Sequence, residues 1–228
     1  MKKKKLVVLT GAGISAESGI KTFRDSDGTW ENYNVDDVAT LFGWFRNPRL
    51  VNDFYNERRL QLATVKPNAA HYGLKELEEQ FDVTIVTQNV DDLHERAGST
   101  NILHLHGELT KVCNEQKKNI TDIGYTELKF GDEDKDGKLL RPFIVWFQED
   151  VPNISKAQKL VKESDILVVI GTSMQVYPAA GLVEFKKEKT PMYIINPQKD
   201  TTGNHYFNCT EINEPATKGV QTLIKLLK

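Results

Sequence analysis

The chain has 228 residues, 39% hydrophobic and 27% charged, which is typical of a globular protein with one large domain or one domain carrying a small insertion. Its 30 Lys and Arg residues nearly balance 32 Asp and Glu residues, so the net charge of -2 offers no basic surface for nucleic acid. No stretch approaches the ~20 consecutive apolar residues of a membrane span. We therefore expect no nucleic acid and no membrane among its partners.

The start "MKKKK" is followed by the apolar run "LVVLT", which is too short for the hydrophobic region of a signal peptide. We expect Lys2 to Lys5 to form a solvated lead into a first strand. Two cysteines, Cys113 and Cys209, cannot form a disulfide framework and fit a reducing compartment. These features predict a cytoplasmic protein, which we expect to be a monomer.

The elements alternate along the chain. A buried strand is predicted over 6–10, a helix start at "SAESG", and helical structure over 33–71 with breaks at Asn47-Pro48 and at "KPN" (66–68). Further strands are predicted over 82–89, 101–107, 142–147, 165–173 and 191–197, with a short apolar stretch at 206–209 and a closing helix from about Thr217. Strands that alternate with helices indicate an α/β protein with a doubly wound parallel sheet.

Gly11 and Gly13 follow the first strand directly, where a nucleotide phosphate can approach bare backbone. The spacing departs from G-x-G-x-x-G because Ala16 takes the last position, and a glycine turn can also be purely structural. In the following segment, Arg24 would pair with a phosphate and Phe23 would shield a reactive centre from water, unless this is an ordinary surface loop.

Polar residues also follow other strands. Gln88, Asn89 and Asp91 suit a carboxamide ligand, although the Asn-Val-Asp turn could merely cap a helix. His104 and His106 face one side of a strand; a shared metal site is conceivable, but a general-base histidine is the stronger hypothesis. The third group is Gly171, Thr172 and Ser173. Together with Asn196 at a fourth strand end, these residues suit contacts with ribose and phosphate.

With these residues assembled, the chain resembles the sirtuin family of NAD-dependent protein lysine deacylases. The matching motifs, in family order, are "GAGISAESGIKTFR", "TQNVDDLHERAG", "HLHGEL", "RPFIVWF", "GTSMQVYPAAG" and "INP". The resemblance implies one catalytic domain over 1–228. Its Rossmann-like core would comprise 1–32, 72–110 and 142–228, with a helical insertion at 33–71 and a degenerate zinc-module insert at 111–141.

The resemblance also implies roles for residues. His106 would be the general base, acting with Asn89 and Asp91. NAD+ would be consumed as co-substrate and held by Gly11, Ala12, Gly13, Ser15, Ala16, Glu17, Ile20, Thr22, Phe23, Arg24, Trp30, Gln88, Asn89, Val90, Asp91, Gly171, Thr172, Ser173, Asn196, Pro197, Gln198 and Ala216. Acylated-lysine proteins or peptides would bind at Ala39, Tyr55, Arg58, Val145, Trp146 and Phe147, with the strand 145–150 pairing with the peptide. Gln148 stands where the family commonly shows Gly.

In the implied reaction, the acyl oxygen attacks the ribose anomeric carbon as nicotinamide leaves. His106 then activates a ribose hydroxyl, and water releases lysine and O-acyl-ADP-ribose. Two alternatives remain: NAD hydrolysis or ADP-ribosyl transfer on the same fold, and a non-enzymatic sensor of NAD metabolites.

Tyr55 and Arg58 lie three residues apart, on one helical face. In the sirtuins that prefer malonyl and succinyl lysine, a Tyr-x-x-Arg pair binds the acyl carboxylate, and Ala39 matches a small residue that widens the acyl pocket. A carboxylate in an apolar tunnel needs such charge-assisted donors. The alternative is that Arg58 and Arg59 simply form a basic helix face.

The insert carries Cys113 where the family commonly has the first of two Cys-x-x-Cys pairs, and no further cysteine precedes Pro142. One thiol cannot assemble a tetrahedral zinc site, so we expect no zinc. Asp132, Asp134 and Asp136 copy the start of an EF-hand loop, but Phe143 occupies the position of the bidentate Glu. We predict a metal-free hairpin with its turn at Asp134 to Gly137, supported by the apolar residues Tyr125, Leu128, Phe130 and Leu140.

Overall fold

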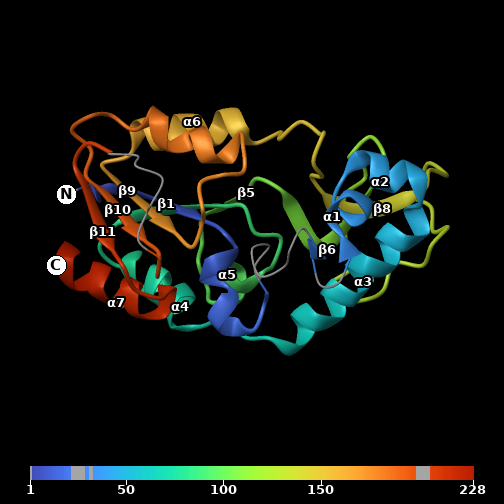
Figure 1. Cartoon of the computed structure of the whole chain (residues 1–228), viewed down its shortest axis with the longest axis horizontal. Helices are drawn as coiled ribbons and strands as arrows, with labels where there is room; N and C mark the ends of the chain where they lie inside the picture. The colour runs from blue at the N-terminus through green and yellow to red at the C-terminus, as the bar shows by residue number, and fades with distance from the viewer. Residues whose placement is uncertain (1, 22–28, 31–32, 199–205) are drawn as a thin grey trace.

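A computed structural model of the chain describes residues 2–21, 29–30, 33–198 and 206–228, with only the backbone at 29 and 30. Its described part is built around a six-stranded parallel sheet in the order β11-β10-β9-β1-β4-β5 (Figure 1). The strands are β1 (Lys5–Thr10), β4 (Asp82–Thr87), β5 (Ile102–His104), β9 (Ile166–Ile170), β10 (Met192–Ile195) and β11 (Cys209–Ile212). This is the doubly wound strand order whose direction reverses between β1 and β9. The predicted fold class is confirmed.

The central strands are buried on both faces. Leu6 and Val8 of β1 face one helical layer, and Val7 and Leu9 face the other, all at most 5% exposed. β1 pairs in parallel with β4 on one side and with β9 on the other, Val8 lying opposite both Ile85 and Val168. A continuous apolar run is therefore required here, because a polar side chain on either face would lose its hydration.

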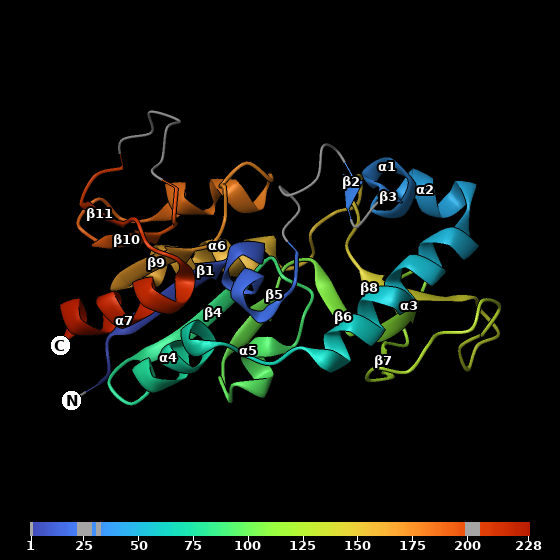
Figure 2. The ribbon, with the colours of Figure 1, turned by 60° about the horizontal axis from the view of Figure 1, so that its bottom comes forward.

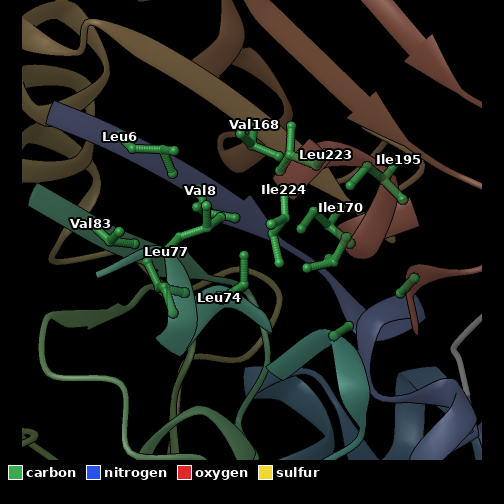
Figure 3. Packing of buried hydrophobic residues seen from close by; sticks show 14 of the residues in the cluster. Leu6, Val8, Leu74, Leu77, Val83, Val168, Ile170, Ile195, Leu223 and Ile224 are labelled. Carbon is green, nitrogen blue, oxygen red and sulfur yellow. The ribbon is translucent and has the colours of Figure 1, made fainter. Parts of the chain in front are cut away.

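Helices cover both faces of the sheet. One layer holds α6 (Ile154–Glu163) and the 3-10 helix η3 (Ala179–Phe185); the other holds α4 (Ala69–Leu77) and α7 (Ala216–Leu227) (Figures 1 and 2). Figure 3 shows how the layer of α4 and α7 packs on the sheet. Leu74 and Leu77 of α4 and Leu223 and Ile224 of α7 lie beside sheet residues such as Val8.

A smaller lobe lies at the end of the molecule's long axis that is opposite the six-stranded sheet (Figure 2). It contains β2 (Thr29–Trp30), β3 (Tyr33–Asn34), α1 (Val35–Val38), α2 (Leu41–Arg46), α3 (Pro48–Thr64) and the antiparallel strands β7-β6-β8. The three antiparallel strands are β6 (Gly107–Asn114), β7 (Thr121–Asp122) and β8 (Leu140–Ile144). Its apolar cluster includes Phe54, Tyr55, Trp44 and Trp146.

Both predicted helix breaks are confirmed. Asn47 caps α3, accepting from the Leu50 N–H, and Pro48 takes the first turn, where no N–H partner is needed. Asn68 caps α4 in a capping box with His71. α4 belongs to the layer beneath the sheet, although its first three residues fall in the range predicted as helical insertion.

Two expectations were wrong. The segment 142–147 does not join the parallel sheet: β8 pairs antiparallel with β6 in the small lobe, because an apolar run does not reveal which sheet buries it. The residues after Gly11 form two 3-10 turns, η1 (Ala12–Ile14) and η2 (Ala16–Ser18), instead of an α-helix. The second turn ends at Gly19 with φ of 97°, a left-handed conformation that stops a helix.

The insert folds around Asp134, as the predicted turn requires. The Asp134 N–H donates to the Lys138 carbonyl at 2.8 Å, and the Gly137 N–H donates to the Asp134 carbonyl at 3.0 Å. The Asp134 carboxylate accepts from Asn114 and Asn119, each at 2.8 Å, which ties the hairpin to the loop between β6 and β7. Of the predicted apolar support, Leu128 is 4% exposed, whereas Phe130 is 40% exposed beneath the Arg49 guanidinium. Within the described ranges, no helix is long and apolar enough to cross a membrane.

Candidate active site at the strand switch point

The carboxyl ends of β1 and β9 meet through glycines. The Gly13 N–H donates to the Gly171 carbonyl at 2.8 Å, and a Cβ on Gly13 would lie 2.7 Å from the Gly171 Cα. Gly171 itself has φ of 61°. Both positions therefore exclude side chains, and the two turns are held together at the point where the strand order reverses.

Two distant side chains hold the turns that follow Gly11. Asn68 donates through its amide to the Ile14 carbonyl at 2.8 Å and to the Ser18 hydroxyl at 3.0 Å. Glu17 accepts from the N–H and the hydroxyl of Thr217, at the first turn of α7, at 2.9 and 2.7 Å. The two 3-10 turns, which have their own short-range hydrogen bonds, are thus also held by the first turns of α4 and α7.

A buried polar cluster joins the ends of β1 and β4. The Ser15 hydroxyl donates to the Asp91 carboxylate at 2.9 Å, and the Asn89 amide donates to Ser15 at 3.2 Å. The other Asp91 oxygen accepts from the Leu93 N–H at 3.2 Å. Asn89 and Asp91 are 7% and 6% exposed, so this arrangement is the rigid, dry kind of site that catalysis uses.

The pKa of Asp91 is raised to about 6. Burial disfavours the carboxylate, while the hydrogen bonds from Ser15 and Leu93 and the charge of His104 act in the opposite direction. Asp91 is consequently ionised at neutral pH and gains a proton in mildly acidic solution.

His106 is held in one tautomer. Its Nδ1 lies 3.0 Å from the Gln88 carbonyl oxygen, which only accepts, so Nδ1 carries the proton and Nε2 keeps its lone pair. Burial lowers the pKa of His106, partly opposed by that hydrogen bond. A neutral imidazole with a free basic nitrogen is what a general base requires.

His104 lies two residues before His106, and its ring contacts the backbone carbonyl of Asn89, the residue after Gln88. Its Nδ1 lies 2.9 Å from the Asn89 oxygen and its Nε2 lies 2.8 Å from Glu95. Both ring nitrogens are therefore occupied by oxygen acceptors. Among the described residues, no group of three His, Cys, Asp or Glu side chains could hold a metal ion.

The small lobe is joined to this cluster by backbone bonds. The Val145 N–H donates to the His106 carbonyl at 2.9 Å, and the Leu109 N–H donates to the Val90 carbonyl at 2.8 Å. The N–H groups of Trp146 and Phe147 donate to the Glu149 carboxylate and the Ala39 carbonyl. These three successive N–H groups are thus engaged within the protein, and the pairing of a peptide with the strand 145–150 stays a prediction.

The predicted acyl-binding residues cluster in the small lobe. Trp146 donates through Nε1 to the Tyr55 hydroxyl at 3.0 Å, and burial raises the pKa of Tyr55 beyond its usual range. The Arg58 guanidinium lies 5.0 Å from the Phe54 ring centre. Its side chain is 15% exposed, and its Nη2 donates to Glu57 at 3.4 Å, whereas Nε and Nη1 are buried with no hydrogen-bond partner in the described part of the chain. Arg59 is fully buried and donates to the Leu109 carbonyl, so this pair does not form a basic helix face.

The remaining predicted residues divide into two groups. Thr22, Phe23 and Arg24, and the side chain of Trp30, lie outside the described residues. Among the others, the Gln88 amide donates to the Thr172 hydroxyl at 3.2 Å across the ends of β4 and β9. Asn196 follows β10 and forms a turn in which it accepts from the Gln198 N–H at 3.2 Å. Ala216 starts α7 and is buried.

Residue patterns did not reveal Asn68, Glu95 or Arg141 as parts of the site. For Asn68, the signal was present: an Asn cap with a polar residue three positions later begins α4. Glu95 and Arg141 contact the site through the tertiary structure. The Arg141 guanidinium pairs with Glu149 at 2.9 Å and lies 3.5 Å from the Trp146 ring centre. No local spacing indicates such contacts.

Comparison with known proteins gives a consistent result. The model of the Sir2 family matches residues 11–178. An NAD-dependent protein deacylase of Bacteroides thetaiotaomicron is 52% identical over 98% of both chains, and one of Helicobacter pylori strain 26695 is 52% identical over 98% of this chain and 97% of its own.

Solved structures agree. A Sir2 homologue in complex with NAD has a TM-score of 0.85 at 36% identity, covering 99% of this chain and 91% of its own. A Sir2 protein with a deacetylated p53 peptide and 3'-O-acetyl ADP ribose has a TM-score of 0.80 at 27% identity, covering 98% and 94%.

Proposed function

Because the chain belongs to the Sir2 (sirtuin) family and is an NAD-dependent protein deacylase, we propose that it removes acidic acyl groups, succinyl and malonyl, from lysine side chains, with acetyl as a weaker substrate. NAD+ is the co-substrate. The proposal rests on the small lobe, where the acyl group would lie.

The residues at the switch point fit NAD+. Glycines at 11, 13 and 171 bring backbone to the edge of the sheet, and hydroxyl and amide groups of Ser15, Gln88, Asn89 and Thr172 surround it. We assign the buried Asn89 and Asp91 to the nicotinamide side, since an amide beside a carboxylate complements a carboxamide. NAD+ supplies the electrophilic ribose carbon; the chain supplies orientation and exclusion of water.

His106 is assigned as the general base. Its Nε2 lone pair is the group that would take the proton of a ribose hydroxyl, and the Gln88 carbonyl keeps Nδ1 as the donor. The bond from Val145 to the His106 carbonyl connects this base with the lobe that would hold the acyl-lysine.

One observation carries the acyl preference: Arg58 donates through Nη2 to Glu57 at 3.4 Å, but its buried Nε and Nη1 have no hydrogen-bond partner among the described residues. Leaving such donors unpaired costs about 1–3 kcal/mol or more for a charged group, so the site is built to receive an acceptor. A terminal carboxylate on the acyl chain supplies the matching charge and two oxygens. An acetyl group has no carboxylate, so the Arg58 donors would stay unpaired and the free-energy cost of burying them would remain.

The test compares kcat/KM for succinyl, malonyl and acetyl versions of one peptide. Arg58→Met is expected to lower kcat/KM for succinyl and malonyl peptides at least a hundredfold, equivalent to about 3 kcal/mol, and to change deacetylation less than tenfold. Arg49→Met is the matched control, because Arg49 is an exposed arginine of the same helix that stacks on Phe130. Equal losses for all three acyl groups would refute the assignment of Arg58.

The same assay separates the alternative activities. Nicotinamide released only with an acylated peptide indicates deacylation, whereas release without peptide indicates NAD hydrolysis. ADP-ribosyl transfer would label a protein acceptor and leave the acyl group on the peptide. The acyl-binding contacts of Tyr55 and Arg58 favour deacylation, since the alternatives need no acyl site.

A further inference from the structure

His104 and His106 lie on the same side of one chain segment but meet different surroundings. The His106 ring meets a single described oxygen, that of Gln88, whereas the His104 ring lies between two, the Asn89 carbonyl at 2.9 Å and Glu95 at 2.8 Å. A carbonyl and a carboxylate both accept and cannot donate. With Glu95 ionised, both nitrogens of His104 donate, and the ring is then an imidazolium cation.

The surroundings of His104 support the charge. Glu95 comes from α5 (Leu93–Arg96) and Glu108 from β6, while Asp91 faces it from the loop after β4. Burial lowers the pKa of His104, but the hydrogen bond and charge of Glu95, the Asn89 carbonyl and Glu108 outweigh it, and the pKa is raised. The nearby His94 is kept neutral, because burial lowers its pKa far below 6.5.

We propose that His104 is a positioning residue of the deacylase: held by Glu95, its cation fixes the Asn89 carbonyl and keeps the buried Asp91 ionised. The first effect is geometric, since the chain runs from Asn89 through Val90 to Asp91. The second is electrostatic, since the charge of His104 adds to the hydrogen bonds from Ser15 and Leu93 in favouring the ionised form of the buried carboxylate. The proposal rests on the deacylase activity and on the assignment of Asp91 to the nicotinamide side.

A merely structural ion pair predicts something different. Glu95 is 40% exposed, and ion pairs of that kind contribute about 0–1 kcal/mol to folding. Loss of a purely structural ion pair would slightly lower the thermal midpoint and leave the pH dependence of the reaction unchanged.

Three variants separate the effects. His104→Gln can keep a donor to the Asn89 carbonyl but has no charge. Glu95→Gln keeps the imidazole and removes the carboxylate that holds its second proton. His104→Lys keeps a cation. The control is Glu163→Gln, which removes an exposed ion pair with Lys5 at the amino-terminal end of β1.

The first measurement is nicotinamide release with a saturating acyl peptide from pH 5 to pH 9. In the wild type, Asp91 is expected to set an acid limb at about pH 6. In His104→Gln and Glu95→Gln this limb should move up by about one pH unit, which lowers the rate about fivefold at pH 6 and much less at pH 8.5. His104→Lys should bring the limb back towards pH 6, and Glu163→Gln should not move it.

The second measurement does not depend on activity. Histidine ring resonances, followed by NMR against pH, should show His104 titrating above 6.5 in the wild type and lower in Glu95→Gln. An unmoved acid limb in both neutral variants, or a His104 ring that titrates as an ordinary histidine, would overturn the proposal. Failure of the deacylase assignment would look different, because the wild type itself would release no peptide-dependent nicotinamide at any pH.

Discussion

The side-chain amide of Asn68 donates to the backbone carbonyl of Ile14 at 2.8 Å, so the residue that caps α4 also holds the 3-10 turn η1, which we assign to NAD+ binding. Its oxygen accepts from the Ala70 N–H at 2.9 Å, while its nitrogen serves Ile14 and Ser18. The amide oxygen of Asn68 thus caps the helix, while its amide nitrogen holds the turn.

We predict that Asn68→Asp separates these functions. Aspartate is as good a helix cap as asparagine, but it cannot donate to the Ile14 carbonyl and places negative charge against it. The KM for NAD+ should rise about tenfold with a small change in thermal midpoint. Asn68→Ala, which removes the cap as well, should raise the KM and also lower the thermal midpoint. An unchanged KM in Asn68→Asp would show that the Ile14 bond does not matter for NAD+.

Acid should destabilise the fold through a buried histidine. Burial lowers the pKa of His71 to about 4, weakly opposed by the charge of Glu95. Because the folded pKa lies below the ordinary value of 6.5, the neutral ring is favoured in the fold, and stability is lost as pH falls from 6.5 towards 4. The loss amounts to about 3 kcal/mol at pH 4.

His71→Gln tests this without removing the cap, because glutamine at this position can complete a capping box and does not titrate. Urea unfolding at pH 7, 5.5 and 4.5 should show a shallower loss of unfolding free energy in the variant than in the wild type. Parallel curves would contradict a role for His71 and leave the neighbouring His94, whose ring centre lies 4.9 Å away, as the candidate.

The insert is predicted to depend on Asp134 and not on metal. Hydrogen bonds from the Asn119 amide and the Lys138 N–H, with others from Asn114 and Asp136, hold the pKa of Asp134 well below its usual range. A depressed carboxylate pKa stabilises the fold above the ordinary value of 3.8, and this contribution is lost as pH falls further.

Asp134→Ala should therefore lower the thermal midpoint at pH 7 more than Asp136→Ala, whose carboxylate accepts from Asn119 alone. Treatment with a chelator should leave the midpoint and activity of the wild type unchanged, and metal analysis should find no stoichiometric zinc. Zinc bound one to one, and activity lost with it, would refute the expectation of a metal-free insert.

Gln148 is predicted to be strained. It has φ of 74°, a left-handed conformation that costs a residue with a Cβ roughly 1–2 kcal/mol. Its amide oxygen accepts from the Phe42 N–H at 3.3 Å, a weak compensation. At this position glycine should give a more stable protein than alanine, by about 1 kcal/mol in chemical unfolding, and the reverse order would show that the strain is absent.

The sequence predicted the parts that depend on local chemistry. The buried strand 6–10, the helix breaks at Asn47-Pro48 and at 66–68, and the turn at Asp134 all follow from side chains within four residues, and the structure has each of them. The polar residues at strand ends were found because parallel strands bring their carboxyl ends to one edge.

Other features needed the tertiary structure. The sheet that receives 142–147 depends on β6, and the 3-10 turns after Gly11 depend on Asn68 and Thr217, which are far from these turns in the sequence. Arg59 illustrates the same limit: a charged residue beside Arg58 appears exposed by composition, yet its guanidinium is buried against the Leu109 carbonyl.

The bond between Glu17 and Thr217 spans 200 positions, nearly the whole chain. During synthesis the amino-terminal turn leaves the ribosome first but lacks this support until α7 has been made. The turn that we assign to NAD+ is therefore among the last parts of the molecule to be completed. A nascent or carboxyl-terminally shortened chain should carry every residue assigned to catalysis and still bind NAD+ weakly.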